Sequence, residues 1–140
     1  MAGGYQLRLR NGQVEHRMIQ QFTHVNNRSR FNFAQRLSAD QTFAPDKDDS
    51  FRFRYRMSLL FPLSGDAIDV KEYYIKVNNE YVNRFRGGDY DLEIRLGPTI
   101  GHKFKDSNKL EVGLDYRINS FFNGSPNHKF RFSLNWFLAI

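Results

Sequence analysis

The chain has 140 residues, the length of one domain, so we treat residues 1–140 as a single domain. It contains no cysteine, which excludes a disulfide framework and a thiolate metal site, and no stretch approaches the ~18 consecutive apolar residues of a transmembrane helix. The net charge of +6 is compatible with contact to nucleic acid or phosphate-bearing lipid headgroups, or with a merely basic surface.

Large apolar and polar residues alternate along most of the chain, and this pattern predicts β-strands because successive side chains of a strand point to opposite faces. The clearest example is Phe51 to Leu63, where arginines alternate with aromatic residues at its start. Eight such segments follow in chain order, at about residues 5–10, 13–25, 28–43, 51–63, 70–83, 90–104, 110–119 and 128–140. We predict no helix.

Turn residues separate the segments. Asn11-Gly12 is typical of a two-residue hairpin. We expect further turns at Asn26-Asn27, at Ser64-Gly65-Asp66 and at Lys105-Asp106-Ser107-Asn108. The loops that we expect to be available to a partner lie at Asp46 to Ser50, Arg84 to Asp89 and Phe121 to Asn127.

Eight hairpin-linked strands predict an all-β, antiparallel, up-and-down barrel. In a soluble barrel the apolar face would line a ligand cavity, whereas in a transmembrane barrel it would meet lipid. Three features favour the transmembrane barrel. Gly97, Gly101 and Gly113 share the charged face, where a narrow lumen needs small residues. That face carries acids and bases together, and the apolar side chains are too bulky to fit inside eight strands.

The charged face predicts a polar lumen filled by a structural ion-pair network, because a buried charge without a partner costs several kcal/mol or more. We expect this network to comprise Arg17, Arg36, Arg52, Arg54, Arg56, Glu72, Lys76, Glu80, Asp91, Glu93, Arg95, Glu111, Asp115, Arg117 and Arg131.

Aromatic residues near the strand ends would fall where outer-membrane barrels carry interfacial girdles. We expect them to be Tyr5, Phe43, Phe61, Tyr90, Phe104, Tyr116 and Trp136.

Several short motifs carry a family resemblance: Val14-Glu15-His16-Arg17, Phe33-Ala34-Gln35-Arg36-Leu37, Phe51 to Arg56, Phe61-Pro62-Leu63 and Asn79-Glu80-Tyr81-Val82-Asn83. From about residue 13 to the end, the chain resembles a family of uncharacterised bacterial outer-membrane β-barrel proteins, a domain of unknown function. The resemblance implies additional amino-terminal strands, which this chain lacks, so we expect a smaller barrel or a truncated or engineered form. Ile140 departs from the aromatic residue that usually ends such barrels.

We predict no catalytic, cofactor or metal site. The four histidines, His16, His24, His102 and His128, fall on the apolar face, where an interfacial place is expected. The carboxylates share their face with arginines, which favours ion pairs over acid-base catalysis. Arginines and aromatics lie on opposite faces, whereas a nucleic-acid-binding sheet needs both on one face.

We therefore expect an integral protein of the bacterial outer membrane, not an enzyme, with a structural or binding role and a plugged lumen. The opening residues carry no signal peptide. Its partners would be membrane lipid or detergent, and an unidentified molecule bound by the loops, with no nucleic acid; we expect a monomer. The alternatives are a soluble eight-stranded barrel that carries an apolar ligand and, third, an outer-membrane lipid-modifying enzyme or protease.

Overall fold

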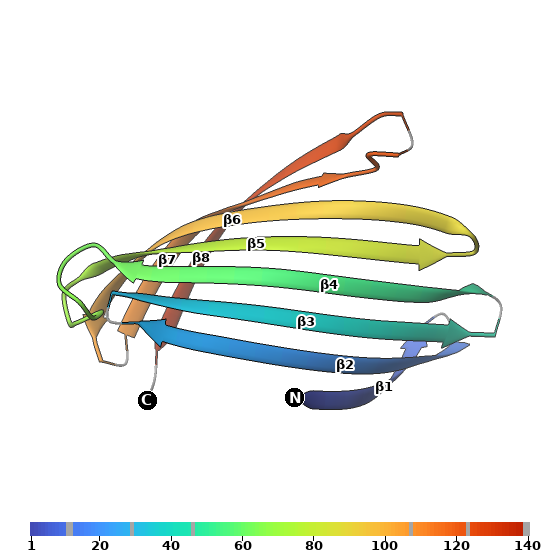
Figure 1. Cartoon of the computed structure of the whole chain (residues 1–140), viewed down its shortest axis with the longest axis horizontal. Helices are drawn as coiled ribbons and strands as arrows, with labels where there is room; N and C mark the ends of the chain where they lie inside the picture. Colours follow the sequence, from blue (N-terminus) through green and yellow to red (C-terminus); the bar gives the residue numbers. More distant parts are fainter. Residues whose placement is uncertain (11–12, 29, 46, 107, 123, 139–140) are drawn as a thin grey trace.

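The computed structural model describes residues 1–10, 13–28, 30–45, 47–106, 108–122 and 124–138. Eight antiparallel strands form one sheet in chain order, so the expected all-β, up-and-down arrangement is confirmed (Figure 1). The strands are β1 (Ala2–Arg10), β2 (Gln13–Arg28), β3 (Phe31–Ala44), β4 (Lys47–Pro62), β5 (Tyr73–Arg86), β6 (Asp89–Lys105), β7 (Asn108–Asn119) and β8 (Asn127–Leu138).

The described residues include no helix that is long and apolar enough to cross a membrane.

Several connections differ from the sequence-based expectation. Asn26 and Asn27 do not turn but pair with β3, because the partner strand satisfies their backbone groups and outweighs their turn propensity. Residues 47–50 belong to β4 and not to a loop. In contrast, the β4–β5 connection covers residues 63–72, so β5 begins later than expected. The predicted turn at Asn11-Gly12 lies outside the described residues.

The expected loop from Arg84 to Asp89 is a two-residue turn. Both Gly87 and Gly88 have positive φ angles, 55° and 88°. Residues with a Cβ rarely adopt this conformation, and it matches the twist of a tight hairpin. The strands therefore extend up to this turn, with Arg86 paired to Asp89.

The sheet is not closed. Within the described residues β1 pairs only with β2 and β8 only with β7, so the expected barrel closure is not observed. The sheet is nevertheless strongly curled, and β7 and β8 pass behind the front strands in Figure 1. We call the end where β1 begins and β8 ends the terminal end. The distal end, opposite to it, carries the β3–β4, β5–β6 and β7–β8 connections.

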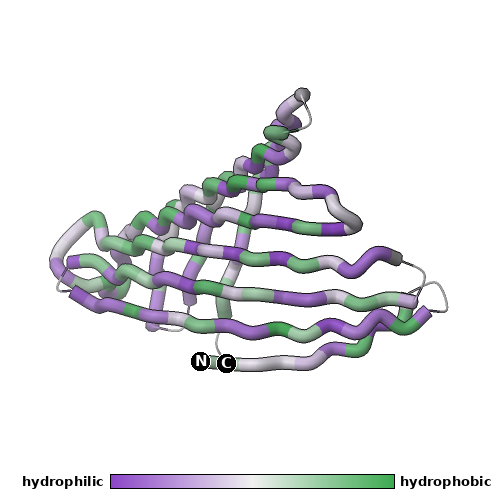
Figure 2. Tube along the Cα trace, turned by 45° about the vertical axis from the view of Figure 1, so that its right-hand side comes forward, coloured by the Kyte–Doolittle hydropathy of each residue, from purple (hydrophilic) through white to green (hydrophobic). Residues whose placement is uncertain are grey.

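The polarity of the two faces is the reverse of that in a water-soluble protein, because charged residues are buried and large apolar residues are exposed. We call the face that carries Phe51, Ile100 and Leu134 the outer face, and the face that carries Asp40 and Glu111 the inner face. Hydrophobic and hydrophilic residues alternate along the strands in Figure 2. Five polar or charged residues are buried, namely Glu15, Ser38, Asp40, Glu93 and Glu111, and the buried hydrophobic core among the described residues includes only Tyr74 and Val82 as large side chains.

A glycine on β6 lets a tyrosine cross the inner face. Tyr74 on β5, Gly101 on β6 and Glu111 on β7 lie in one row of the strand register. The Tyr74 ring lies over Gly101, and its hydroxyl donates a hydrogen bond to Glu111 at 2.9 Å. A Cβ on Gly101 would come within 2.1 Å of the Tyr74 ring, so this contact requires glycine.

We predict that Gly101→Ala lowers the free energy of unfolding by about 1–3 kcal/mol, because the new methyl group would displace the Tyr74 ring. Gly97→Ala on the same strand and face is the matched control. Its Cβ would meet nothing closer than 3.8 Å, so a change within about 0.5 kcal/mol is expected. Denaturant unfolding followed by circular dichroism measures both. Equal losses would contradict the placement of Tyr74 over β6.

Candidate functional site

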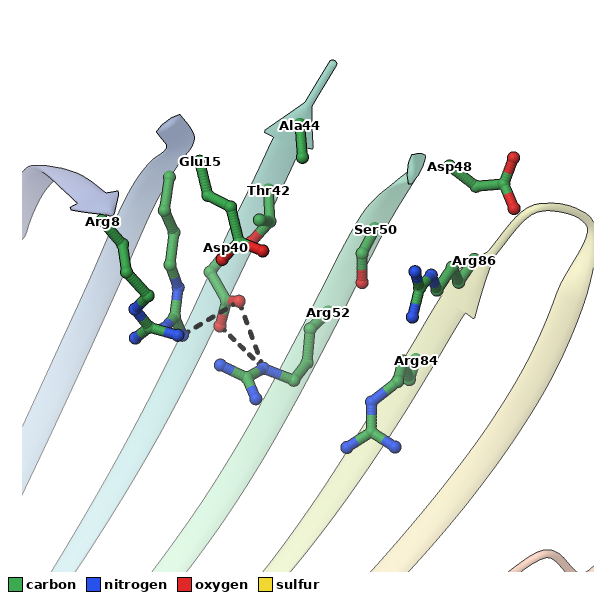
Figure 3. A pocket seen from close by; sticks show the side chains of 11 residues that line it. Arg8, Glu15, Asp40, Thr42, Ala44, Asp48, Ser50, Arg52, Arg84 and Arg86 are labelled. Atoms are coloured by element: carbon green, nitrogen blue, oxygen red, sulfur yellow. Dashed lines mark hydrogen bonds and ion pairs between the residues drawn. The ribbon is translucent and has the colours of Figure 1, made fainter. Parts of the chain in front are cut away.

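The inner face is the candidate site because most of the predicted ion-pair residues meet there. Asp40 on β3 lies at the centre of one cluster. Its carboxylate forms ion pairs with Arg17 on β2 at 3.1 Å, with Arg52 on β4 at 3.0 Å and with Arg54 on β4 at 3.4 Å. Figure 3 shows Arg52 reaching toward the carboxylate of Asp40. One buried carboxylate thus holds three arginines from two neighbouring strands, which leaves this cluster positively charged.

A second cluster joins β5 and β6. Arg95 contacts Glu80 at 2.9 Å and also donates to Glu93 on its own strand. Arg84 contacts Asp91 at 3.4 Å and approaches Glu93 at 3.9 Å. Acids outnumber bases here, in contrast to the cluster at Asp40. The cluster at Asp40 thus has a positive excess, whereas the group formed by Arg84, Arg95, Glu80, Asp91 and Glu93 has one more acid than base.

Two smaller ion-paired groups also lie on the inner face. Lys76 on β5 contacts Glu111 on β7 at 2.6 Å, across the intervening strand β6. Arg117 and Asp115 pair within β7. The contact between β5 and β7 shows that the inner face is concave, since side chains from strands that are not neighbours meet above β6.

Four predicted members of the network make no ion pair with a described residue. Arg36 and Arg56 lie opposite each other in the β3–β4 register, and like charges that face each other cannot pair. Arg131 lies opposite Asp115. Glu72 precedes β5 and accepts a hydrogen bond from the backbone N–H of Asp69 at 3.1 Å, so it belongs to the connection and not to the inner face.

The predicted interfacial aromatics lie on the outer face, and most gather near the strand ends. Tyr5, in the middle of β1, is the exception. Toward the distal end, Tyr90 packs between Phe85 and Phe122. The centroid of its ring lies 4.8 Å from that of Phe85 and 5.4 Å from that of Phe122. The others divide between the distal end, with Phe43 and Tyr116, and the terminal end, with Phe61, Phe104 and Trp136.

Three of the four histidines, His16, His102 and His128, contact aromatic residues. Tyr5 shares a hydrogen bond with His16 at 2.5 Å, and Tyr116 shares one with His128 at 2.8 Å. The ring of His102 lies 4.3 Å from that of Tyr73. In the part of the chain that the structure describes, no three His, Cys, Asp or Glu residues are grouped so that they could hold a metal ion.

Sequence reasoning left Asp40, the central carboxylate, out of the network, although Asp40 shares the parity of Arg36 in β3 and its period-two position already indicated the inner face. Three further members of the inner face were also missed. Tyr74 shares the parity of Lys76 in β5, so its period-two position already indicated the inner face. Arg84 was assigned to a loop because the Gly87-Gly88 turn was expected to be wider. Glu15 faces Arg8 across the β1–β2 register and is buried.

We predict that Asp40→Asn lowers the free energy of unfolding by about 3 kcal/mol or more, because three arginines lose the one charge that they share. Asp66→Asn is the matched control. The Arg30–Asp66 pair is solvent-exposed, with 71% and 77% of the two side chains accessible, so its loss should change the unfolding free energy by less than about 1 kcal/mol. Similar effects of the two substitutions would show that Asp40 is exposed to water.

Comparison with known proteins places the chain in a family. No curated protein and no solved structure matches it. Residues 1–131 match the family described as "Protein of unknown function (DUF2490)". The match thus begins at the first residue, and not near residue 13 as the motifs suggested. Since it covers almost the whole chain, the protein belongs to the DUF2490 family, an uncharacterised domain.

Proposed function

We propose that this protein is an integral outer-membrane β-barrel with a structural or binding role, in which β1 pairs with β8 and ion pairs fill the lumen. The observation that carries the proposal is the inverted polarity of the sheet. Large apolar side chains of the outer face are exposed, with Phe132 at 81% and Leu134 at 71%, while carboxylates of the inner face are buried. Lipid is the solvent in which this distribution is favourable.

Strand length and aromatic placement also support the membrane proposal. β2 to β8 contain 12 to 17 residues, enough for the ~9–11 residues that a tilted strand needs to cross a bilayer. Aromatic side chains near both strand ends would lie at the two membrane interfaces. The proposed localisation is the bacterial outer membrane, with lipid as the first partner.

The inner face supports a plugged lumen and a non-enzymatic role. Lys76, Arg84, Arg95 and Arg117 each hold a carboxylate, which disfavours carboxylates acting as acid-base catalysts. A soluble carrier of an apolar ligand would need an apolar lining, and this arrangement does not favour it. Closure between β1 and β8 would remove the unpaired strand edges, which supports a monomer.

The β7–β8 connection is the best candidate for contact with a partner. Residues 47–50 and most of residues 84–89, where further loops were expected, belong to strands, whereas the described residues 120–122 and 124–126 form a loop at the distal end. Phe122 in this loop has 67% of its surface exposed, although its ring contacts Tyr90. An apolar side chain at the rim of the sheet is suited to contact a membrane surface or a protein.

We predict that the chain requires detergent to stay dispersed and, once refolded in detergent, migrates faster on a gel before heating than after heating. A closed barrel resists unfolding by the gel detergent because its backbone hydrogen bonds have no free edge. A chain that purifies as a dispersed monomer in buffer without detergent would contradict the membrane proposal.

Pairing of β1 with β8 can be tested by introducing cysteine pairs, because the chain contains no cysteine of its own. Leu7→Cys on β1 is combined in turn with Phe130→Cys, Phe132→Cys or Leu134→Cys on β8. A disulfide within one chain at one of these positions supports pairing of β1 with β8. Disulfides that form only between chains would show that the edges pair intermolecularly.

We predict that Leu134→Arg lowers the unfolding free energy in lipid by about 2–4 kcal/mol, because it places a charge in hydrocarbon near the middle of β8. Phe122→Arg serves as the control, since the same charge in the β7–β8 loop would remain in water. Both variants are measured by denaturant unfolding from lipid vesicles. If Leu134→Arg is as neutral as the control, the outer face meets water.

A further inference from the structure

A cavity at the distal end of the inner face is lined mainly by charged residues, among which arginines outnumber acids. Its volume is about 460 Å³, and side chains from β1 to β5 contribute to it (Figure 3). Its charged lining consists of five arginines and three acids: Arg8, Arg17, Arg52, Arg84, Arg86, Glu15, Asp40 and Asp48. Thr42 and Ser50 add hydroxyl groups. The lining therefore carries a formal excess of two positive charges (5 − 3 = 2).

The cations of this cavity are incompletely neutralised. Arg17 and Arg52 share Asp40. Arg8 on β1 and Arg86 on β5 make no ion pair with any described residue, and they approach the cavity from opposite sides in Figure 3. Two exposed guanidinium groups thus flank a pair of arginines that already divide one carboxylate.

Arg17 has unused hydrogen-bonding capacity as well. Its Nη2 contacts Asp40, but its Nε is buried and has no hydrogen-bond partner among the described residues. A buried donor without an acceptor destabilises the folded state. An anionic oxygen in the cavity could accept a hydrogen bond from the guanidinium of Arg17. Its negative charge would also reduce the repulsion among the arginines.

We propose that this cavity binds a phosphate group. Guanidinium groups match phosphate through paired N–H donors, and several of them around one group are suited to a dianion. Arg8 and Arg86, which have no ion-pair partner among the described residues, together carry two positive charges that a phosphate dianion or monoester would balance. The site lies at the distal rim of the inner face, so it is independent of whether the outer face meets lipid. The phosphate comes either from a lipid headgroup at the membrane surface or from a soluble phosphate compound.

The test is a calorimetric titration of the full chain with inorganic phosphate, in zwitterionic detergent or in buffer if the chain is dispersed there. We expect saturable binding, weakened by about tenfold or more in the double variant Arg8→Gln/Arg86→Gln through the loss of two charge-assisted contacts. These exposed residues make no described ion pair, and circular dichroism checks that the variant folds.

The matched control is Arg28→Gln/Arg30→Gln, which removes the same two charges at the terminal end. It should change phosphate affinity less than about twofold, since exposed charges that far away are screened by salt. Absence of saturable binding in the unaltered chain would overturn the proposal. Equal weakening by the two double variants would overturn it too, because binding would then follow net charge alone.

A competition experiment separates the two sources of phosphate. Micelles that contain phosphatidic acid are compared with micelles of phosphatidylcholine alone, at constant inorganic phosphate. Displacement of bound phosphate by phosphatidic acid identifies the lipid headgroup as the ligand. Binding of inorganic phosphate that phosphatidic acid does not displace identifies a soluble phosphate compound, and either result supports the cavity as the site.

Discussion

The antiparallel register is the constraint on which the rest of the structure depends. Because side chains alternate with period two, a register that sets Arg52 opposite Asp40 also sets Phe51 opposite Gln41 on the other face. A slip by one residue would bury the aromatics and expose the acids of every strand that followed. The ion pairs between strands therefore fix the polarity of the sheet as well as holding neighbouring strands together.

Burial makes these ion pairs interdependent. Asp40 is almost fully buried, so its negative charge is stabilised by the arginines around it, and its loss would leave those arginines without their shared carboxylate. At the other side of the sheet, Glu111 is held by Lys76 and Tyr74, and Tyr74 reaches it only because Gly101 has no side chain. Small and charged residues thus specify the inner face, where other folds use apolar packing.

The sequence predicted the number of strands, their order and the face of most residues, because alternation is local and survives in every strand. It did not predict that the strands include Asn27, Ser50 and Arg86, since pairing with a neighbouring strand outweighed turn propensity there. The sequence also did not predict which residues of the network form ion pairs with each other. Whether Arg36 meets an acid or Arg56 depends on register, which no single strand encodes.

The uneven distribution of charge along the inner face has a functional consequence. A network that served only to fill a lumen would be most stable with each acid close to one base. Instead, three arginines share Asp40, and Arg8 and Arg86 stay exposed at the distal rim, while Arg84 and Arg95 meet three acids, Glu80, Asp91 and Glu93. Such separation costs electrostatic energy in the absence of a ligand, and an anion at the rim recovers part of it. The inner face thus combines paired charges along most of its length with arginines at its distal end that are unpaired among the described residues.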